Sequence, residues 1–333
     1  MAITKIEVDN FTVFERLKID INASVNVFIG ENGTGKTHLL KFISQCINPY
    51  GSGLLNSYDA KFDCSIERLL RNQIEVGKAT TTMGEEAFPY TIEPNPLEGI
   101  SAVATFKFSP RDVPQYYENV VFIPAKDMLT HSPRFLSLVR ERSKQMPFDE
   151  TLISTISKAQ LPALDEVPEI AKTILPELEK EMNGSVVFEN DEFFILKKSD
   201  GRKSPFSVEA EGMKKIGLIW CLLMNGSITK DSILLWDEPE ANINPKLIPL
   251  LVDIILELGR NGVQIFLATH DYFLPKYIEV SSTDADKVAF HSLYKTDNGV
   301  KCETDTKFSL LDENAIIQER INLYEAEIDK RWE

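Results

Sequence analysis

The sequence predicts an α/β fold in which helices cover a parallel β-sheet. Strand-like and helix-like segments alternate through much of the chain, which is typical of parallel sheets. Apolar runs at Val25–Ile29, Ile233–Trp236 and Val263–Ala268 have the character of strands buried on both faces. The first 30 residues instead combine alternating and apolar segments, which indicate additional strands near the N-terminus.

Composition restricts the class of protein further. The chain has 333 residues, of which 43% are hydrophobic, and a net charge of −15. This length is sufficient to bury a sizeable core without disulfides or metals. The acid excess argues against a surface that coats nucleic acid.

The sequence also indicates the cellular environment. The longest apolar stretches, Ile216–Met224 and Leu247–Leu258, are shorter than the roughly 20 residues of a membrane-spanning helix. The N-terminus lacks a signal-peptide pattern. The four cysteines form no C-x-x-C pair, as expected for free thiols in a reducing compartment. We therefore expect a cytoplasmic protein that does not contact a membrane.

The expected N-terminal elements lead from strands into a glycine-rich turn and a helix. They are strands at Ile3–Val8, Phe11–Ile21 and Val25–Ile29, a helix over about 36–46, and strands at Ala102–Phe108 and Val120–Ile123. A helical region interrupted by five prolines follows at 131–182. We predict an antiparallel β subdomain near the N-terminus and a central helical insertion.

The expected C-terminal elements return to the strand–helix alternation. They are strands at Ser185–Phe188 and Phe193–Lys197, a helix over about 209–224, strand Ile233–Trp236, helix Pro245–Leu258, strand Val263–Ala268, helix Phe273–Ile278, strand Lys287–Tyr294 and a final acidic helix. The predicted division is 1–125 for the first part of the main domain, 126–200 for the insertion lobe, and 201–333 for the second part.

A phosphate-binding loop follows the first buried strand. The segment Gly30-Glu31-Asn32-Gly33-Thr34-Gly35-Lys36-Thr37 fits G-x-x-x-x-G-K-[ST] between a strand and an amphipathic helix. Backbone N–H groups and the helix N-terminus would surround phosphate oxygens, and Lys36 would reach the β- and γ-phosphates of ATP. The expected nucleotide contacts are Gly30, Asn32, Gly33, Thr34, Gly35, Lys36, Thr37 and His38. A chance glycine-rich turn is the alternative.

Two further buried strands end in polar side chains. Asp237 and Glu238 follow Ile233–Trp236, and His270 follows Val263–Ala268. Parallel strands deliver their carboxyl ends to one edge of the sheet, where ligands bind. Asp237 and Thr37 would hold Mg²⁺, Glu238 would orient or deprotonate the attacking water, and His270 would contact the γ-phosphate or that water. A solvated acidic turn and a surface histidine are the ordinary alternatives.

The order of these motifs resembles ABC-type ATPase domains. Asp237-Glu238-Pro239-Glu240-Ala241-Asn242-Ile243-Asn244-Pro245 is similar to the D-E-P-E-x-x-L-H-P stretch of SMC-like and OLD-like (overcoming lysogenization defect) ATPases, departing from it at Ile243 and Asn244. Ile6-Glu7-Val8-Asp9-Asn10-Phe11 resembles the start of that group. The resemblance implies a P-loop NTPase head that binds ATP and Mg²⁺ and dimerises around them, with Lys36, Glu238 and His270 in catalysis.

The signature segment of that family is altered. Gly212 matches the glycine that contacts nucleotide on the opposite subunit, but Ala210 or Glu211 occupies the position of the family serine. Gly212 N–H, the helix N-terminus and Lys214 could replace the serine. The alternative is an ordinary helix start capped by Ser207. We find no clear Q-loop glutamine; Ala125-Lys126-Asp127 is the segment that could take its place.

The rest of the chain indicates which additional domains this head lacks. Prolines in 131–182 exclude long coiled-coil arms, and the 63 residues after His270 are too few for a Toprim nuclease domain. Any effector, a nuclease or a toxin, would therefore be a separate chain. The last helix has an apolar stripe at Ile317, Ile321, Tyr324 and Ile328, which we expect to dock on the protein's own core, with a partner-binding role as the alternative.

Nucleic-acid binding is possible but has only one local indication. Lys126, Arg134, Arg140, Arg142 and Lys144 form a basic stretch, for which a solvated helix face is the more usual explanation. Phe11 and Phe14 could stack on adenine, although core packing is the stronger expectation.

Two functions of different classes follow. The first is an ATPase, a homodimer or higher homo-oligomer, that acts as a nucleotide switch on an effector in bacterial anti-phage defence or DNA repair. The second is an ATP-binding scaffold or sensor with little or no hydrolysis. A small-molecule kinase would not need Glu238 or His270 at these places.

Overall fold

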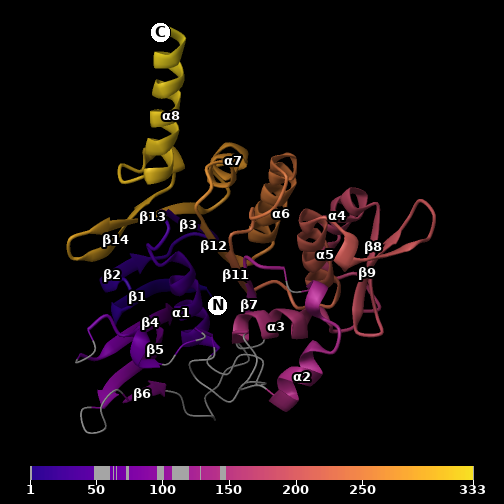
Figure 1. Cartoon of the computed structure of the whole chain (residues 1–333), viewed down its shortest axis with the longest axis horizontal. Coiled ribbons are helices and arrows are strands. Elements are labelled where there is room, and N and C mark those ends of the chain that lie inside the picture. Colours follow the sequence, from indigo (N-terminus) through magenta and orange to yellow (C-terminus); the bar gives the residue numbers. More distant parts are fainter. Residues whose placement is uncertain are drawn as a thin grey trace.

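The computed structural model describes most of the chain and places its strands in three sheets (Figure 1). The described residues are 2–48, 61–62, 64, 66–72, 75–95, 101–106, 120–127, 129–142 and 148–332. None of the helices in these ranges is long and apolar enough to cross a bilayer.

The central sheet is six-stranded and combines strands from distant parts of the sequence. Its order is β14-β13-β3-β12-β11-β7. The strands are β3 (Val25–Gly30), β7 (Val120–Ile123), β11 (Ile233–Asp237), β12 (Gln264–Thr269), β13 (Val288–Thr296) and β14 (Gly299–Asp305). All pairings are parallel except that of the edge strand β14 with β13. The predicted α/β fold with a parallel sheet is confirmed.

Alternate side chains of the buried strands enter two separate cores. All residues of β3, β11 and β12 are buried, as expected of strands covered on both faces. Along β3, Val25, Val27 and Ile29 join the core beneath the C-terminal helices, whereas Phe28 joins the core beneath α1. The period of two in the strand thus determines which face each side chain covers.

One face of the central sheet packs against α1 and the antiparallel sheet. Helix α1 (Lys36–Ile47) follows the phosphate-binding loop directly. The antiparallel sheet has the order β2-β1-β4-β5-β6. Its strands are β1 (Ile3–Phe11), β2 (Phe14–Asp20), β4 (Gly77–Met83), β5 (Glu86–Asn95) and β6 (Ser101–Phe106). The expected N-terminal antiparallel β subdomain is therefore present.

Helices from the second half of the chain cover the opposite face. The largest core contains residues of α5 (Glu211–Met224), α6 (Ile248–Arg260) and α7 (Phe273–Ser281). Helix α6 follows a short 3₁₀ turn at Pro245–Leu247. Helix α4 (Leu175–Met182) lies beside α5 (Figure 1).

The central region contains helices and a small sheet. Its helices are α2 (Phe135–Arg142), α3 (Glu150–Ala159) and α4, and its sheet joins β8 (Gly184–Glu189), β9 (Glu192–Lys197) and β10 (Lys203–Pro205). Asp149 caps α3 by accepting hydrogen bonds from the backbone N–H groups of Thr151 and Leu152. The division of the chain at 126 and 200 stays a prediction.

Two expectations for the C-terminal region were wrong. The sequence analysis stopped at a strand near Tyr294, but the structure continues into the β13–β14 hairpin. The Asn298-Gly299 pair, with Gly299 at φ +98°, is the turn signal that was overlooked. Helix α8 (Ala315–Trp332) does not dock along the core; it projects from the molecule (Figure 1), because only its first turn packs there.

Candidate functional site

The phosphate-binding loop connects the end of β3 to the start of α1. Gly30 and Gly35 have φ values of +148° and +86°, a region that favours glycine. A Cβ on Gly30 would lie 2.3 Å from the Leu293 carbonyl oxygen, and one on Gly35 would lie 2.6 Å from Val13 Cγ2. Glycine is therefore required at these two positions, because each has a positive φ and leaves no space for a Cβ.

Lys36 points back into this loop. Its Nζ donates hydrogen bonds to the carbonyl oxygens of Gly30 at 2.7 Å and Glu31 at 2.9 Å. Burial lowers the pKa of Lys36, while Glu238 and Asp237 oppose that shift. The ammonium group thus sits where the loop would surround phosphate oxygens, close enough to exchange carbonyl partners for phosphate.

Thr37 and Asp237 bring a hydroxyl and a carboxylate together across 200 residues of sequence. Thr37 Oγ1 lies 3.0 Å from each Asp237 carboxylate oxygen. Burial raises the pKa of Asp237 to about 6, which a bound cation would reverse. The described residues contain no cluster of three or more His, Cys, Asp or Glu that could hold a metal. This pair of oxygens suits Mg²⁺, which commonly uses few protein ligands together with phosphates.

Glu238 and His270 lie at the ends of the neighbouring strands β11 and β12. His270 Nδ1 and Glu238 Oε1 are 3.0 Å apart, and both side chains are partly exposed. Glu238 has φ +44°, an unusual conformation for a residue with a side chain, and its N–H donates to the Ala268 carbonyl at 2.8 Å. The structure thus brings together two of the three residues predicted for catalysis, and Lys36 faces the same groove.

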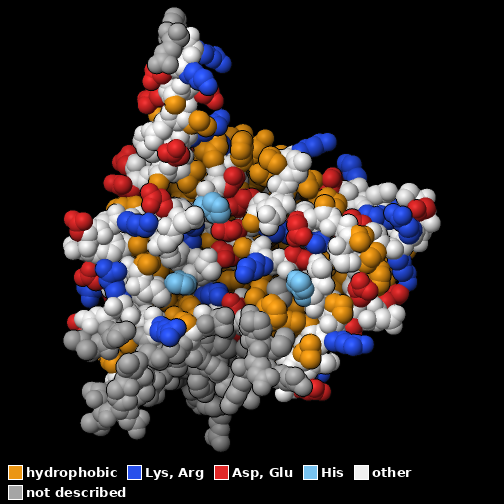
Figure 2. Space-filling view, viewed as in Figure 1, with side chains coloured by type: hydrophobic (Ala, Val, Ile, Leu, Met, Phe, Trp, Pro, Cys, Tyr) orange, Lys and Arg blue, Asp and Glu red, His pale blue; other side chains and the backbone are white. Residues whose placement is uncertain are grey.

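Lys36, Thr37 and Glu238 border one open groove of about 210 Å³. It is lined by Val13, Asn32, Gly33, Gly35, Lys36, Thr37, His38 and Glu238. Figure 2 shows histidine, acidic and lysine side chains gathered near the centre of this face. His38 is largely buried, which lowers its pKa, and its Nδ1 has no hydrogen-bond partner among the described residues. Phe11 and Phe14 are fully buried, so core packing is their role.

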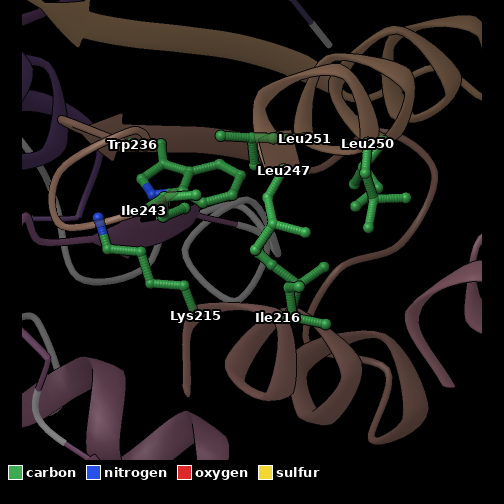
Figure 3. A pocket seen from close by; sticks show the side chains of 9 residues that line it. Lys215, Ile216, Trp236, Ile243, Leu247, Leu250 and Leu251 are labelled. Carbon is green, nitrogen blue, oxygen red and sulfur yellow. The ribbon is translucent and has the colours of Figure 1, made fainter. Parts of the chain in front are cut away.

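Lys215, which the sequence analysis did not single out, supports the turn that carries Glu238. Its Nζ donates to the carbonyl oxygens of Glu238 at 2.9 Å and Pro239 at 3.2 Å. Burial lowers the pKa of Lys215 to about 8 against the opposing effect of Glu240 and Glu238. Lys215, Trp236 and Ile243 line one apolar pocket beneath the turn (Figure 3). The sequence feature that could have indicated this role is the pair of adjacent lysines, Lys214 and Lys215, early in a largely apolar helix.

Glu240 ties the same turn to β12. Thr269 Oγ1 donates to Glu240 Oε1 at 2.5 Å, and burial raises the pKa of Glu240 to about 7. Thr269 Oγ1 also accepts a hydrogen bond from the Asp271 N–H at 3.0 Å. The polar residues that follow β11 and β12 are therefore held together by side chains as well as by strand pairing.

The start of α5 does not have the serine cap that was the alternative to a signature-like segment. Ser207 lies in a 3₁₀ turn at Phe206–Val208, and the N-cap of α5 is Ala210, which makes no side-chain hydrogen bond. The alternative, an ordinary helix start capped by Ser207, is therefore not what the structure shows. Gly212 is buried, and a Cβ there would lie 3.1 Å from Leu247 Cδ1.

Lys214 is engaged within its own chain. Its Nζ lies 2.6 Å from Glu211 Oε1 and 3.8 Å from Asp127 Oδ2. Asp127, from the segment after β7 that could replace a Q-loop, thereby reaches the start of α5. A role for Lys214 at a nucleotide held by a second subunit would require it to leave these partners.

The described side chains of the basic stretch are exposed, and Arg140 lies on α2, a helix whose other side is packed. Lys126, Arg134 and Arg140 are exposed, whereas Phe135 and Val139 are buried. Lys144 lies outside the described residues, as does the side chain of Arg142. The packing of α2 is that of an ordinary solvated helix face.

Comparisons with known proteins agree with this geometry. A family model described as "AAA domain, putative AbiEii toxin, Type IV TA system" matches residues 122–274, and one described as "AAA ATPase domain" matches residues 1–79. The chain is similar to AAA-type ATPase domains over both of these segments. The segment 1–79 contains the phosphate-binding loop. The segment 122–274 contains the two polar strand ends.

Individual relatives are distant. The DNA replication and repair protein RecF of Leifsonia xyli is 24% identical over 127 residues, which is 37% of this chain and 31% of RecF. The match thus spans about a third of that relative's length. An Smc head bound to the C-winged-helix domain of ScpA has a TM-score of 0.58 at 14% identity, covering 92% of this chain and 98% of that one.

A second solved structure shows the same architecture. The Smc head domain with an extended coiled coil, bound to the C-terminal domain of ScpA from Pyrococcus furiosus, has a TM-score of 0.55 at 12% identity, covering 97% of this chain and 98% of that one. At these identities the likeness shows the fold alone.

Proposed function

We propose that this SMC-like ATPase domain binds MgATP, dimerises around it and hydrolyses it, and that the nucleotide state controls a separate effector protein. The observation that carries the proposal is that Lys36, Thr37 and Glu238 line one groove. Asp237 is hydrogen-bonded to Thr37, and His270 lies 3.0 Å from Glu238. Such groups at three adjacent strand ends match what phosphoryl transfer to water requires: phosphate binding, charge neutralisation and orientation of water.

Each side chain would perform a different part of the reaction. Lys36 would exchange its loop carbonyls for the β- and γ-phosphate oxygens and stabilise charge there. Thr37 and Asp237 would hold Mg²⁺, which supplies Lewis-acid stabilisation of phosphate charge when bound. Glu238 would accept a hydrogen bond from the attacking water, and His270, 3.0 Å from Glu238, would orient that carboxylate or contact the γ-phosphate.

The comparisons suggest the biological setting of the proposed switch. We propose a role in anti-phage defence of the OLD-like kind, with a nuclease or toxin as effector. The family model whose description names a putative AbiEii toxin supports the toxin. The similarity to RecF supports DNA repair. The Smc heads bound to ScpA support a protein partner, and we propose that the assembly works in the cytoplasm as a homodimer or higher homo-oligomer.

A scaffold that binds ATP without turnover is the second candidate. Ala210 provides no hydroxyl at the start of α5, and Lys214 is held by Glu211 and Asp127. Both features argue against the contact expected between this segment, which includes Gly212, and a nucleotide bound by an opposite subunit.

ATP turnover by the purified protein distinguishes these functions. We expect Lys36→Ala to lose MgATP binding, and Glu238→Gln to retain binding, lose turnover and accumulate an ATP-bound dimer. Lys18→Ala, an exposed lysine on β2, is the matched control and should behave as wild type. Phosphate release and light scattering measure both properties.

The outcomes separate the candidates. Wild-type turnover no faster than that of Glu238→Gln, with MgATP still bound, would favour the scaffold. Normal MgATP binding by Lys36→Ala would contradict the assignment of the loop itself.

A further inference from the structure

The contact between Glu238 and His270 joins two partly exposed side chains. These side chains are 31% and 48% exposed, and His270 Nδ1 lies 3.0 Å from Glu238 Oε1. A contact of this kind at the surface contributes little by itself, because water competes for both groups and two side chains must be ordered. The geometry of this pair therefore depends on how firmly the backbone at each of the two residues is held.

Hydrogen bonds to the backbone hold the Glu238 side of the pair. The Glu238 N–H donates to the Ala268 carbonyl oxygen at 2.8 Å. Lys215 Nζ donates to the carbonyl oxygens of Glu238 and Pro239. The surroundings thereby maintain the positive φ of Glu238, which is unfavourable for a residue with a side chain. Helix α5 and strand β12 together fix this side.

Thr269 holds the His270 side of the pair. It is the last residue of β12, lies directly before His270 and is fully buried. Its hydroxyl accepts a hydrogen bond from the Asp271 N–H at 3.0 Å and donates one to Glu240 Oε1 at 2.5 Å. Since a hydroxyl has a single proton to donate, that proton is committed to Glu240. Thr269 therefore fastens the backbone before and after His270 to one carboxyl group.

The carboxyl group of Glu240 is buried at a cost in stability. The residue is 9% exposed, its Oε2 has no hydrogen-bond partner among the described residues, and burial raises its pKa to about 7. A buried polar oxygen without a partner is unfavourable, and an apolar side chain of similar size would avoid that penalty. Proteins keep such unfavourable groups mainly at functional sites, so Glu240 indicates a role in the site rather than in the core.

Glu240 also acts on the lysine that supports the other half of the pair. Burial lowers the pKa of Lys215 to about 8, and Glu240 is the largest of the charges that oppose this shift. Glu240 therefore favours the ammonium form of Lys215, which donates to the carbonyl oxygens of Glu238 and Pro239. One side chain thus interacts with both supports, with Thr269 by a hydrogen bond and with Lys215 by its charge.

We propose that Glu240 is a positioning residue for the contact between Glu238 and His270. It acts by accepting a hydrogen bond from the Thr269 hydroxyl, which ties the end of β12, before His270, to the turn after β11. Glu240 is not among the residues that line the nucleotide groove, so it acts on the reaction through its neighbours. Its effect on turnover rests on the proposed ATPase function, whereas its effect on the orientation of His270 does not.

Removal of this hydrogen bond should lower the turnover number and leave MgATP binding nearly unchanged. Glu240→Met and Thr269→Val each remove it while keeping a buried side chain of similar size. We expect the turnover number of either variant to fall about tenfold to a hundredfold, with a KM for MgATP within about twofold of wild type, because a misplaced group loses its action in the transition state. Steady-state phosphate release measures both constants.

Conservative variants at the same positions should retain the function. Thr269→Ser keeps the hydroxyl, and Glu240→Gln keeps an oxygen that can accept its hydrogen bond. Both should keep turnover within about fivefold of wild type at pH 7. Thr155→Val is the matched control, because Thr155 is buried on α3, donates to the Phe122 carbonyl oxygen at 2.8 Å and does not line the groove. It should lower the melting temperature as Thr269→Val does, but leave turnover unchanged.

The imidazole of His270 reports its own orientation without any turnover. The chain has four histidines, so nitrogen-15 NMR can assign the His270 signals by comparison with His270→Gln. In the neutral ring, a carboxylate beside Nδ1 favours the proton on that nitrogen. We expect the Nδ1–H form in wild type and in Thr269→Ser, and its loss in favour of the Nε2–H form in Glu240→Met and Thr269→Val.

The His270 signal and the kinetics together decide the proposal. An unchanged His270 signal in Glu240→Met and Thr269→Val would overturn it, and so would equal losses of turnover and MgATP affinity, which indicate disruption of the whole site. If Glu240→Met does not fold, the comparison of Thr269→Val with Thr269→Ser gives the same answer. A wild type that hydrolyses no ATP would contradict the proposed function alone, because the His270 signal tests the positioning role in that protein as well.

Discussion

At the scale of single residues, burial rather than residue type sets the chemistry of the groove. Asp237 is a carboxylate held in a buried position beside Thr37, and its pKa rises to about 6 because water is excluded. Lys36 is held in the same way with its pKa lowered. Because burial disfavours the charged form of both groups, each would be stabilised by a ligand of opposite charge. Without a ligand, these buried charges lower the stability of the protein.

This balance predicts the effect of removing the carboxylate. The pKa of Asp237 is higher in the folded chain than in the unfolded one, so ionisation opposes folding above about pH 6 and this effect is lost as the pH falls to about 4. We expect Asp237→Asn to raise the free energy of unfolding of the nucleotide-free protein by up to about 2 kcal/mol at pH 7.5.

Melting curves check the expectation. The advantage of Asp237→Asn over wild type should shrink between about pH 6 and pH 4, while Asp20→Asn, at an exposed aspartate on β2, should show no such trend. A pH-independent difference would show that the Thr37 contact, not desolvation, governs the stability of this site.

At the scale of elements, the strand ends place the chemistry and α5 stabilises it. β3, β12 and β11 are neighbours in the sheet, so their polar ends share one edge. Lys215 of α5 holds the two carbonyl oxygens that follow β11, where Glu238 has its unusual φ. A movement of α5 would therefore displace the backbone of Glu238, because Lys215 is hydrogen-bonded to the Glu238 carbonyl oxygen.

We expect Lys215→Met to lower the turnover number by about tenfold to a hundredfold while changing the KM for MgATP little, because Lys215 positions Glu238 and does not line the groove. Lys215→Arg should retain much of the activity, since it keeps the donors. Steady-state kinetics of these variants beside Lys198→Met, an exposed lysine on the surface, test this.

The pH profile separates positioning from general destabilisation. The pKa of Lys215 is about 8, so wild-type turnover should fall above that pH as the ammonium loses a proton, and Lys215→Arg should not show that fall. An equal loss of turnover and MgATP affinity in Lys215→Met would instead indicate disruption of the whole site.

At the scale of the whole molecule, the first and last parts of the chain form one body. Gln264 on β12 accepts a hydrogen bond from the Ile3 N–H at 2.6 Å and donates to the Ile3 carbonyl at 2.9 Å. β3 lies between β12 and β13 in the central sheet. The head therefore cannot form until strands distant in sequence have paired.

Gln264→Ala tests this connection. It removes buried hydrogen bonds to the backbone of β1, and we expect it to lower the free energy of unfolding by about 2 kcal/mol. Denaturant unfolding followed by tryptophan fluorescence and by circular dichroism should shift together; separate transitions would show that the two ends fold independently.

Sequence alone predicted most of the residues of the candidate nucleotide site. Gly30 to Thr37, Asp237, Glu238 and His270 were found because each follows an apolar run, and parallel strands deliver such residues to one edge. The buried runs also predicted the central strands, because short, largely apolar segments bounded by turns are typical of strands buried on both faces.

Only the tertiary structure decided what supports the site and what remains uncovered. Lys215 and Glu240 act on a turn that lies far from Lys215 in the sequence, and no local pattern reports which carbonyl a lysine will reach. The stripe on α8 was visible in the sequence, but periodicity shows only that a face is apolar. Whether that face meets its own core or another molecule depends on where the chain leaves the sheet, and here the exit of β14 directs α8 away from the head.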